Sequence, residues 1–219
     1  MEIVQIFEQV FSTDRKLATE NAVPGARVYK EKLYKIGNRE YREWDPYRSK
    51  LAGAIKKGLK EFPIKKGMHV LYLGASTGTT ASHVSDIIGN EGTIFCVEIS
   101  AQSMNALLQL SEKRKNFVPI LEDARKPDNY ADVGAVDVIY QDVSQPDQDD
   151  ILIANSQKFL KKDGMAMFCV KSQSINVLEQ PQEVFRKVKN KLAPFFDIIQ
   201  ELKLEPYDKD HLFLVLKKK

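Results

Sequence analysis

The sequence predicts an α/β fold: a seven-stranded, mostly parallel sheet preceded by a small antiparallel β domain. From Gly67 onward, short apolar runs alternate with helical segments, which is typical of parallel strands joined by crossover helices. The last two apolar runs are joined by too few residues for a crossover helix, so they should pair antiparallel. The first 48 residues instead hold runs of β-branched and aromatic residues separated by turn residues.

Residues 1–48 are predicted to form a small N-terminal domain of β-hairpins. The runs EIVQIFEQVF and VYKEKLYKI are rich in residues that favour strands, and the tripeptides VPG and IGN supply turns. A helix is expected over residues 46–61, because its apolar residues recur at a helical spacing.

Residues 49–219 are predicted to form the second, larger domain. Its expected parallel strands are MHVLYL, TIFCVEI, FVPIL, VDVIYQ and MAMFCVK, and the closing hairpin is FFDIIQELKL with HLFLVLKK. Helices are expected over residues 79–88, 101–114, 147–160 and 181–192. A parallel sheet closed by such a hairpin is the usual outline of the S-adenosylmethionine (SAM)-dependent methyltransferase fold, which is Rossmann-like.

Composition narrows the class of protein. No apolar run approaches the roughly 18 residues needed to span a bilayer, and no signal pattern begins the chain, so we expect a cytoplasmic protein without a membrane partner. Both cysteines lie in strand-like segments and are expected to be buried free thiols. Three dispersed histidines do not suggest a metal site. The net charge is only +3, but the positive excess lies in the first 60 residues. These positive charges either bind a polyanion or form a face that is simply exposed to solvent.

The loop LGASTGTT connects the first parallel strand to its helix and carries the first sign of function. Gly74 and Gly78 allow a ligand close to the backbone, and the helix that begins near Thr79 and Thr80 directs free N–H groups toward it. The spacing G-x-x-x-G differs from the G-x-G-x-x-G that holds a dinucleotide pyrophosphate. It therefore favours SAM over NAD, although an NAD-linked oxidoreductase remains an alternative.

Carboxylates follow three further strands of the predicted sheet. Glu98 ends the second strand, 20 residues after Gly78, where it can accept hydrogen bonds from ribose hydroxyls. Asp123 and Ala124 follow the third strand, where they can meet an adenine amino group. Asp142 ends the fourth strand. Because the carboxyl ends of parallel strands form one edge, these residues should surround a single cofactor.

The methyl acceptor is indicated by Asp142 and by Lys171, which ends the fifth strand. The chain lacks the Asn-Pro-Pro-Tyr motif of amino-methylating enzymes, and neither cysteine follows a proline as in cytosine C5 enzymes. A lysine held by a carboxylate suits a hydroxyl acceptor, either as a base or by stabilising the developing alkoxide. Lys50 and His211, at the starts of the first helix and the last strand, can join the same edge.

The sequence resembles one family over its whole length: fibrillarin, the RNA 2′-O-methyltransferases of box C/D ribonucleoproteins. The most specific match is the block EWDPYRSKLA at residues 43–52; others are VPG, YLG through GTT, VE, DARKP, DVSQP and VK. The family's usual loop is close to LGAASGTT. The resemblance implies a catalytic set of Lys50, Asp142, Lys171 and His211. It also implies SAM binding by Tyr72, Gly74, Ala75, Gly78, Thr79, Thr80, Glu98, Asp123, Ala124, Asp142 and Gln145.

The resemblance also implies a role in a particle. A Nop-domain scaffold protein, a kink-turn-binding ribosomal-type protein and a box C/D guide RNA would position target rRNA or tRNA, and no DNA partner is expected. The chain lacks the Gly/Arg-rich N-terminal extension of eukaryotic fibrillarins, so it resembles the compact archaeal form. Two alternatives remain open: methylation of protein glutamine, and a non-catalytic RNA-binding subunit that has kept the pocket.

Overall fold

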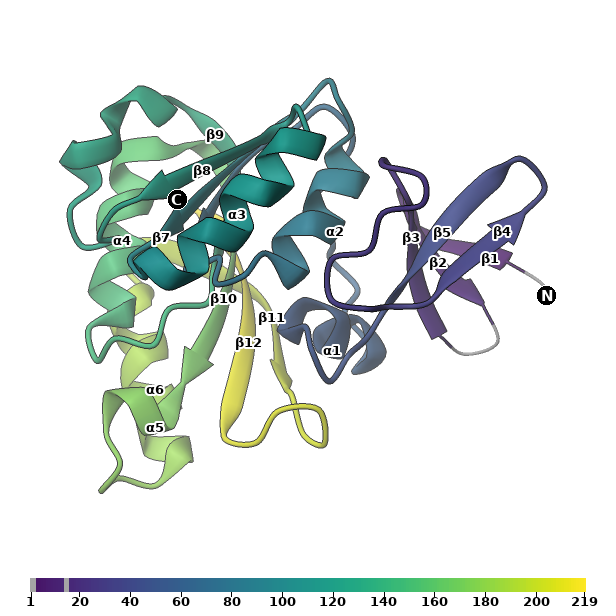
Figure 1. Ribbon diagram of the computed structural model, residues 1–219. Helices are drawn as coiled ribbons and strands as arrows, with labels where there is room; N and C mark the ends of the chain where they lie inside the picture. The colour runs from purple at the N-terminus through teal and green to yellow at the C-terminus, as the bar shows by residue number, and fades with distance from the viewer. Residues whose placement is uncertain (1–2, 14–15) are drawn as a thin grey trace.

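The computed structural model describes residues 3–13 and 16–219, which form two β-sheets with helix α1 between them (Figure 1). Residues 1–2 and 14–15 of the predicted N-terminal domain lie outside the described residues. The described N-terminal strands form one sheet in the order β1-β2-β3-β5-β4, and every neighbouring pair is antiparallel. These strands are β1 (Ile3–Phe7), β2 (Val10–Thr13), β3 (Lys16–Glu20), β4 (Leu33–Ile36) and β5 (Arg39–Trp44).

The second sheet has seven strands, the number that the sequence predicts, and their order is β11-β12-β10-β9-β6-β7-β8. Strands β10, β9, β6, β7 and β8 pair in parallel, whereas β12 is antiparallel to both β10 and β11. The strands are β6 (His69–Leu73), β7 (Thr93–Glu98), β8 (Phe117–Leu121), β9 (Val136–Gln141), β10 (Leu160–Lys171), β11 (Phe196–Lys203) and β12 (His211–Lys218). The antiparallel hairpin of β11 and β12 is therefore confirmed.

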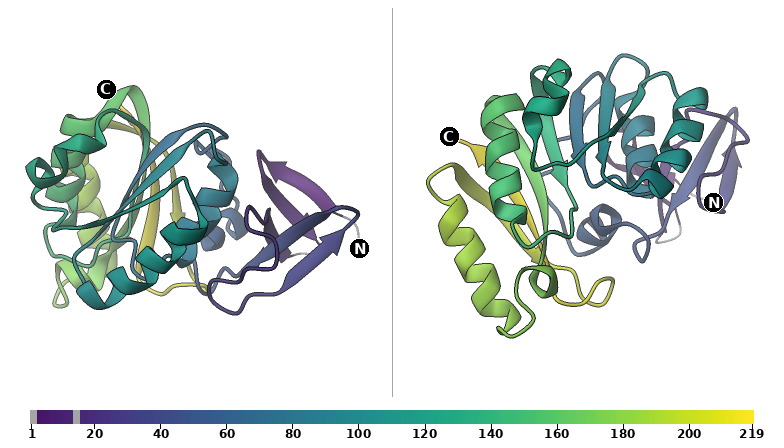
Figure 2. Two further views of the ribbon diagram at one scale, coloured as in Figure 1. Left: turned by 45° about the horizontal axis from the view of Figure 1, so that its top comes forward. Right: turned by 60° about the vertical axis from the view of Figure 1, so that its left-hand side comes forward.

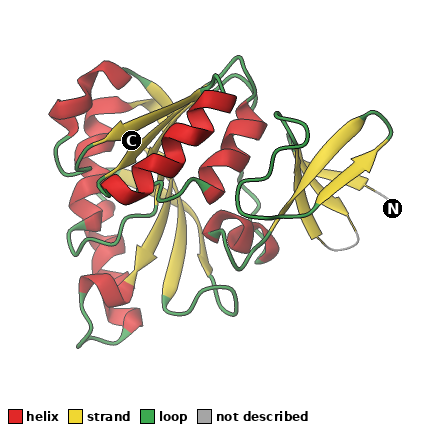
Figure 3. Cartoon of the chain, in the orientation of Figure 1, coloured by secondary structure: helices red, strands yellow, loops and turns green. Residues whose placement is uncertain are grey.

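Helices cover both faces of this sheet (Figures 2 and 3). Alternate strand residues point to opposite faces, so Val70 and Tyr72 belong to one buried cluster and Leu71 and Leu73 to the other. The first cluster includes apolar residues of α1 (Lys50–Lys56), α2 (Thr79–Ile88) and α3 (Ala101–Lys113). The second includes residues of η1 (Pro127–Val133), α4 (Gln148–Phe159) and α6 (Pro181–Leu192); a short α5 (Ser172–Ile175) precedes α6.

Helix α1 is shorter than the sequence predicts. It begins at Lys50, because Ser49 caps its N-terminus by accepting a hydrogen bond from the Ala52 amide. It ends at Lys56, just before Gly58 adopts a φ of 93° that cannot continue a helix. Trp44 ends β5, so the proposed domain boundary at residue 48 falls in the loop between β5 and α1. This loop carries Lys50 directly from the first sheet to the edge of the second.

A buried ionic network joins the two sheets. Arg42 of β5 donates to Glu31 at 2.7 Å and to Asp86 of α2 at 2.8 Å, and its remaining nitrogen donates to Ser82. Arg114, after α3, also donates to Asp86 at 2.6 Å. The charged side chains are at most 2% exposed, and the two arginines balance the two acids. Charges buried in this way must remain paired, so the network fixes the first sheet against α2.

His83 of α2 adds an uncharged contact between the first sheet and α2. Its ring stacks on Trp44 with centroids 4.8 Å apart, and its two nitrogens lie 2.8 Å from the hydroxyls of Thr19 and Tyr29. Burial, together with the nearby Arg42, lowers the pKa of His83 well below its ordinary value. The histidine is thus a packing residue. Among the described residues, no helix is long and apolar enough to cross a bilayer.

Candidate active site

A cavity of ≈ 430 Å³ opens at the carboxyl edge of the parallel strands. This volume is in the range of about 300–1,000 Å³ that is usual for small-molecule sites. Residues that follow β6, β7, β8 and β9 line it, together with residues beside the start of α1 and at the end of β10. The predicted site residues that line it are Lys50, Tyr72, Gly74, Ala75, Thr79, Thr80, Glu98, Ala124, Asp142, Gln145 and Lys171.

Gly74 shapes the cavity where β6 ends. Its φ is 81°, and a β-carbon on it would lie 2.8 Å from the backbone oxygen of Asp142. The Asp142 amide also donates to Leu73 at 2.9 Å, so the ends of β6 and β9 lie side by side. Only glycine fits this close approach, and the loop that follows stays open to a ligand.

Gly78 precedes the first residue of α2 and faces away from the cavity. A β-carbon there would lie 2.3 Å from Leu110 of α3, and its φ of 85° is also left-handed. Its role is therefore to let α2 and α3 pack closely. That packing places Thr79 and Thr80, which do line the cavity, at the start of α2.

Glu98 is held in a fixed position at the end of β7. One carboxylate oxygen accepts from the Ser76 amide at 2.7 Å, and the other accepts from the Ser100 amide at 2.9 Å. The residue is 9% exposed and lines the cavity. Each oxygen retains a further lone pair, so the carboxylate can accept hydrogen bonds from a pair of ligand hydroxyls.

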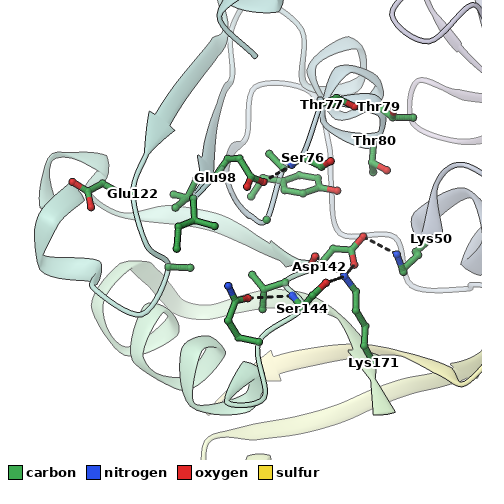
Figure 4. Close-up of a pocket in the computed structure, with 18 of the residues that line it drawn as sticks. Lys50, Ser76, Thr77, Thr79, Thr80, Glu98, Glu122, Asp142, Ser144 and Lys171 are labelled. Atoms are coloured by element: carbon green, nitrogen blue, oxygen red, sulfur yellow. Dashed lines mark hydrogen bonds and ion pairs between the residues drawn. The ribbon is translucent and has the colours of Figure 1, made fainter. Parts of the chain in front are cut away.

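Two lysines contact one carboxylate on the other side of the cavity (Figure 4). Lys50 reaches Asp142 from α1, with 3.2 Å between Nζ and Oδ2, and Lys171 reaches it from the end of β10, with 2.8 Å between Nζ and Oδ1. All three side chains are between 13% and 20% exposed. Segments separated by 92 residues in the chain thus form one charged cluster at the cavity.

Lys171 has two further partners. Its Nζ donates to the backbone oxygen of Asp142 at 3.0 Å and to the Ser144 hydroxyl at 2.8 Å. Asp142 Oδ1, although close to this Nζ, is buried without a hydrogen bond of good geometry, so the contact is mainly ionic. One carboxylate oxygen therefore keeps unused hydrogen-bonding capacity beside the cavity.

Asp208 connects His211 to the cluster. One of its oxygens lies 3.4 Å from Lys50 Nζ and the other lies 3.0 Å from His211 Nδ1. Burial alone would lower the pKa of Lys50, but Asp142 and then Asp208 outweigh it, so this pKa is raised above its ordinary value. Lys50 is consequently charged at neutral pH and acts as an ionic partner.

Three predicted residues do not line the cavity: Gly78, Asp123 and His211. The Arg125 guanidinium instead donates a forked pair of hydrogen bonds to Asp123. These bonds lower the pKa of Asp123 below its usual range, although burial acts in the opposite direction. Its neighbour Ala124 does line the cavity. His211 joins the other catalytic candidates only through Asp208.

Several lining residues were missed by the sequence argument: Arg48, Ser76, Thr77, Glu122 and Ser144. Ser76 and Thr77 lie inside the LGASTGTT loop, and Ser144 lies two positions after Asp142, so proximity in sequence could have suggested them. Asp208 carried no such signal, because only the turn between β11 and β12 brings it to Lys50.

The two cysteines and Tyr72 are not available as nucleophiles. Burial raises the pKa of both Cys96 and Cys169, which are free thiols as expected, so both stay protonated. Burial also keeps the pKa of Tyr72 well above its ordinary value. Within residues 3–13 and 16–219, no group of three His, Cys, Asp or Glu residues could hold a metal ion. The lysine–carboxylate cluster is therefore the chemically prominent feature of the cavity.

Comparison with known proteins identifies the family. The model of the family Fibrillarin matches residues 1–219, the whole length of the sequence. The chain belongs to the fibrillarin family. A fibrillarin-like rRNA/tRNA 2′-O-methyltransferase of Pyrococcus abyssi (strain GE5 / Orsay) is 54% identical over 204 residues, which are 93% of this chain and 90% of the relative.

Two solved fibrillarin structures are similar over nearly the whole chain. Aeropyrum pernix fibrillarin, crystallised with natively bound S-adenosyl-L-methionine, has a TM-score of 0.88 at 40% identity, covering 98% of this chain and 99% of that one. The fibrillarin of a fibrillarin/Nop5p complex has a TM-score of 0.91 at 40% identity, covering 99% and 100%. These two matches confirm the expected SAM-dependent methyltransferase fold with its N-terminal antiparallel sheet, in the form that fibrillarins have.

Proposed function

We propose that this chain is a SAM-dependent RNA 2′-O-methyltransferase that modifies the ribose 2′-hydroxyl of rRNA and tRNA. The observation that carries the proposal is that Asp142 belongs both to the cavity and to the lysine cluster. One carboxylate thereby connects a nucleoside-sized site to charges suited to a hydroxyl acceptor. The Pyrococcus abyssi relative, a 2′-O-methyltransferase of rRNA and tRNA, supports the same activity.

SAM fits the residues that the cavity offers. Glu98, fixed by two backbone amides, suits the ribose hydroxyls of the cofactor, and Gly74 removes the side chain that would block its approach. Ala124, Gln145 and the first residues of α2 complete the lining. When bound, SAM supplies a methyl group on a positively charged sulfur. The SAM-bound Aeropyrum pernix fibrillarin supports this assignment.

The chain's own residues would prepare the acceptor. A hydroxyl becomes a better nucleophile as its proton leaves, and nearby positive charge stabilises the oxygen at that moment. Lys50 and Lys171 place two positive charges on the single carboxylate of Asp142. Because the Ser144 hydroxyl is exposed and accepts from Lys171, we propose that the RNA hydroxyl takes its place on Nζ. Asp208 and His211 would hold Lys50 from the far side.

Partners would supply the choice of target. We propose that a Nop-domain scaffold protein holds this chain, as the fibrillarin/Nop5p complex suggests. A kink-turn-binding protein and a box C/D guide RNA would complete the particle, and guide–target pairing would select the nucleotide. A net charge of +3 is compatible with this division, because the enzyme itself need not read sequence.

The decisive experiment is a methylation assay with the scaffold, kink-turn protein and guide RNA reconstituted around this chain. Labelled methyl from SAM should enter the guided target RNA, and a target with 2′-deoxyribose at the modified position should give no product. Continued transfer to the deoxy target would contradict a ribose acceptor. Labelling of protein glutamine with unmodified RNA would support the alternative acceptor instead. A thermal upshift with SAM, but none with NAD, would exclude the oxidoreductase alternative.

A further inference from the structure

Tyr47 is an exposed aromatic residue beside the reactive cluster. It lies in the loop that leads from β5 into α1, and 67% of its surface is exposed. Its neighbour Arg48 lines the cavity, and Lys50 follows two positions later. The proposed chemistry uses Lys50 but gives Tyr47 no role.

The structure holds Tyr47 in place despite its exposure. The Tyr47 amide donates to Asp45 Oδ1 at 2.9 Å, and the Arg48 amide donates to the Asp45 carbonyl at 3.1 Å, so the loop is a hydrogen-bonded turn. The Tyr47 ring also packs against Tyr207, with centroids 5.1 Å apart and planes at 69°. A fixed aromatic ring loses little conformational freedom on binding, which favours a recognition role.

Tyr207 comes from the opposite end of the chain and is itself anchored. It lies in the turn between β11 and β12, where its amide donates to the Leu204 carbonyl at 2.9 Å. A β-carbon on Gly53 of α1 would lie 3.3 Å from the Tyr207 side chain, so the turn and the helix are closely packed. Asp208, the next residue, pairs with Lys50. The two tyrosines therefore border the cluster on the side of Lys50.

Positive charge accompanies the aromatic pair. Arg48 is exposed, and its guanidinium lies 5.3 Å from the centre of the Tyr29 ring, which steadies it at the cavity wall. Lys209, in the same turn as Tyr207, is also exposed. Asp208, one of the acids in these turns, is already paired with Lys50 and His211. An aromatic ring flanked by the exposed cations Arg48 and Lys209 suits a sugar–phosphate strand better than a protein surface.

The proposed acceptor fixes which side of the RNA must face this surface. In A-form helices the 2′-hydroxyls line the wide, shallow minor groove. A chain that methylates a paired nucleotide must therefore approach from the minor groove, and residues around the cavity mouth must meet the neighbouring sugars and phosphates.

We propose that Tyr47, braced by Tyr207, packs against the ribose next to the acceptor nucleotide, while Arg48 contacts a phosphate of the same strand. This inference rests on the proposed function and adds the surface that positions the acceptor strand. Tyr47 and Arg48 are positioning residues in this scheme, because they touch the RNA beside the reacting hydroxyl and leave the chemistry to the lysine cluster.

The test compares Tyr47→Ala, Tyr47→Phe and a control, Leu178→Ala, in the reconstituted particle. Leu178 is 92% exposed and lies outside the described cavity, so its variant reports general surface effects. Tyr47→Ala should raise the KM for target RNA about tenfold, the loss expected for one well-packed aromatic contact, with little change in kcat or in SAM affinity. Tyr47→Phe should recover most of the loss, because it keeps the ring.

Arg48→Ala provides an independent readout. Removing one phosphate contact should reduce the slope of RNA affinity against salt concentration by about one. A wild-type KM for Tyr47→Ala would overturn the inference, as would a defect only in scaffold binding, which would assign this surface to a protein. If the wild-type protein fails to methylate guided RNA, the proposed function is wrong. If the wild-type protein is active and the Tyr47 and Arg48 variants match it, only this inference is wrong.

Discussion

Lys171 and His211 face each other directly across the antiparallel ladder of β10 and β12. Lys171 ends β10 and His211 begins the antiparallel strand β12, so both lie at the edge where the parallel strands end. Their side chains nevertheless contact different carboxylates, Asp142 and Asp208, and Lys50 bridges the two acids. The five side chains therefore form one continuous ionic chain, and a change at either end should reach Lys50.

Removing the side-chain amine of Lys171 should abolish most of the methyl transfer. Lys171→Ala should lower kcat by about 10²–10⁴-fold, the range for loss of a positioned proton-transfer or charge-stabilising group. SAM binding, measured by calorimetry, should change little, since Glu98 lies across the cavity. Lys187→Ala is the matched control, because Lys187 pairs with Glu179 at the surface. Wild-type kcat for Lys171→Ala would remove this residue from the mechanism.

Asp208→Asn should weaken catalysis without touching the cavity lining. The substitution removes the charge that holds Lys50 and His211 together, so the pKa of Lys50 should fall and its position should loosen. We expect kcat to fall about tenfold, equivalent to about 1.4 kcal/mol. His211→Ala should be no worse, and the double variant should resemble Asp208→Asn. Fully additive losses would show that the two residues act separately.

Glu98→Gln should weaken SAM binding selectively. The loss of charged hydrogen bonds, each worth about 1.5–3 kcal/mol, should raise the Kd for SAM roughly 10- to 100-fold. The kcat at saturating SAM should be largely retained, because Glu98 is remote from the lysine cluster. Glu122→Gln is the control, since Glu122 also lines the cavity but follows a different strand. Equal effects of both substitutions would contradict a specific role for Glu98.

Gly74→Ala and Gly25→Ala should separate steric blockage from backbone strain. Both glycines have a φ of 81°, so each alanine carries a strain of about 1–2 kcal/mol. Only at Gly74 would the new carbon collide with Asp142, whereas nothing lies within 4 Å at Gly25. Denaturant unfolding should show the larger stability loss for Gly74→Ala, together with weaker SAM binding. Equal stability losses would disprove the close approach of β6 and β9.

Stability should fall in mild acid because of His83. Its folded pKa is depressed, so above the unfolded pKa of about 6.5 both states are neutral and stability is complete. As the pH falls below that value, the unfolded chain gains the proton first, and stability drops by up to about 1.4 kcal/mol per pH unit. His83→Gln should be less stable at pH 8 but should show a shallower loss between pH 6.5 and 5. An unchanged slope would assign the acid sensitivity to other groups.

The fold was predictable because its signals are local. Alternating strands and helices, the short interval before β12 and the loop around Gly74 each occupy a continuous stretch of sequence. The length of α1 was overestimated, because apolar periodicity continues past the Gly58 turn that ends the helix. Strand β3 was not anticipated, since its sequence KLATE has no alternating pattern strong enough to mark it.

The candidate site was only partly predictable. Asp142 directly follows β9 and Lys171 ends β10, so both could be located from the strand pattern, and the fold brings them together. Asp208 could not, because its role depends on a turn that folds back onto α1. Asp123 shows a different difficulty: its position after a strand predicts a ligand contact, whereas in the structure Arg125, two residues away, donates to both carboxylate oxygens.

The Arg42–Asp86–Arg114 network has a consequence for behaviour on heating. Water solvates separated ions less favourably as temperature rises, so the cost of keeping these charges dehydrated declines in hot solution. The contact between the two sheets should therefore persist on heating until the whole molecule unfolds. The N-terminal strands would in that case serve as a permanent brace for the loop that delivers Lys50, and would not swing as an independent module.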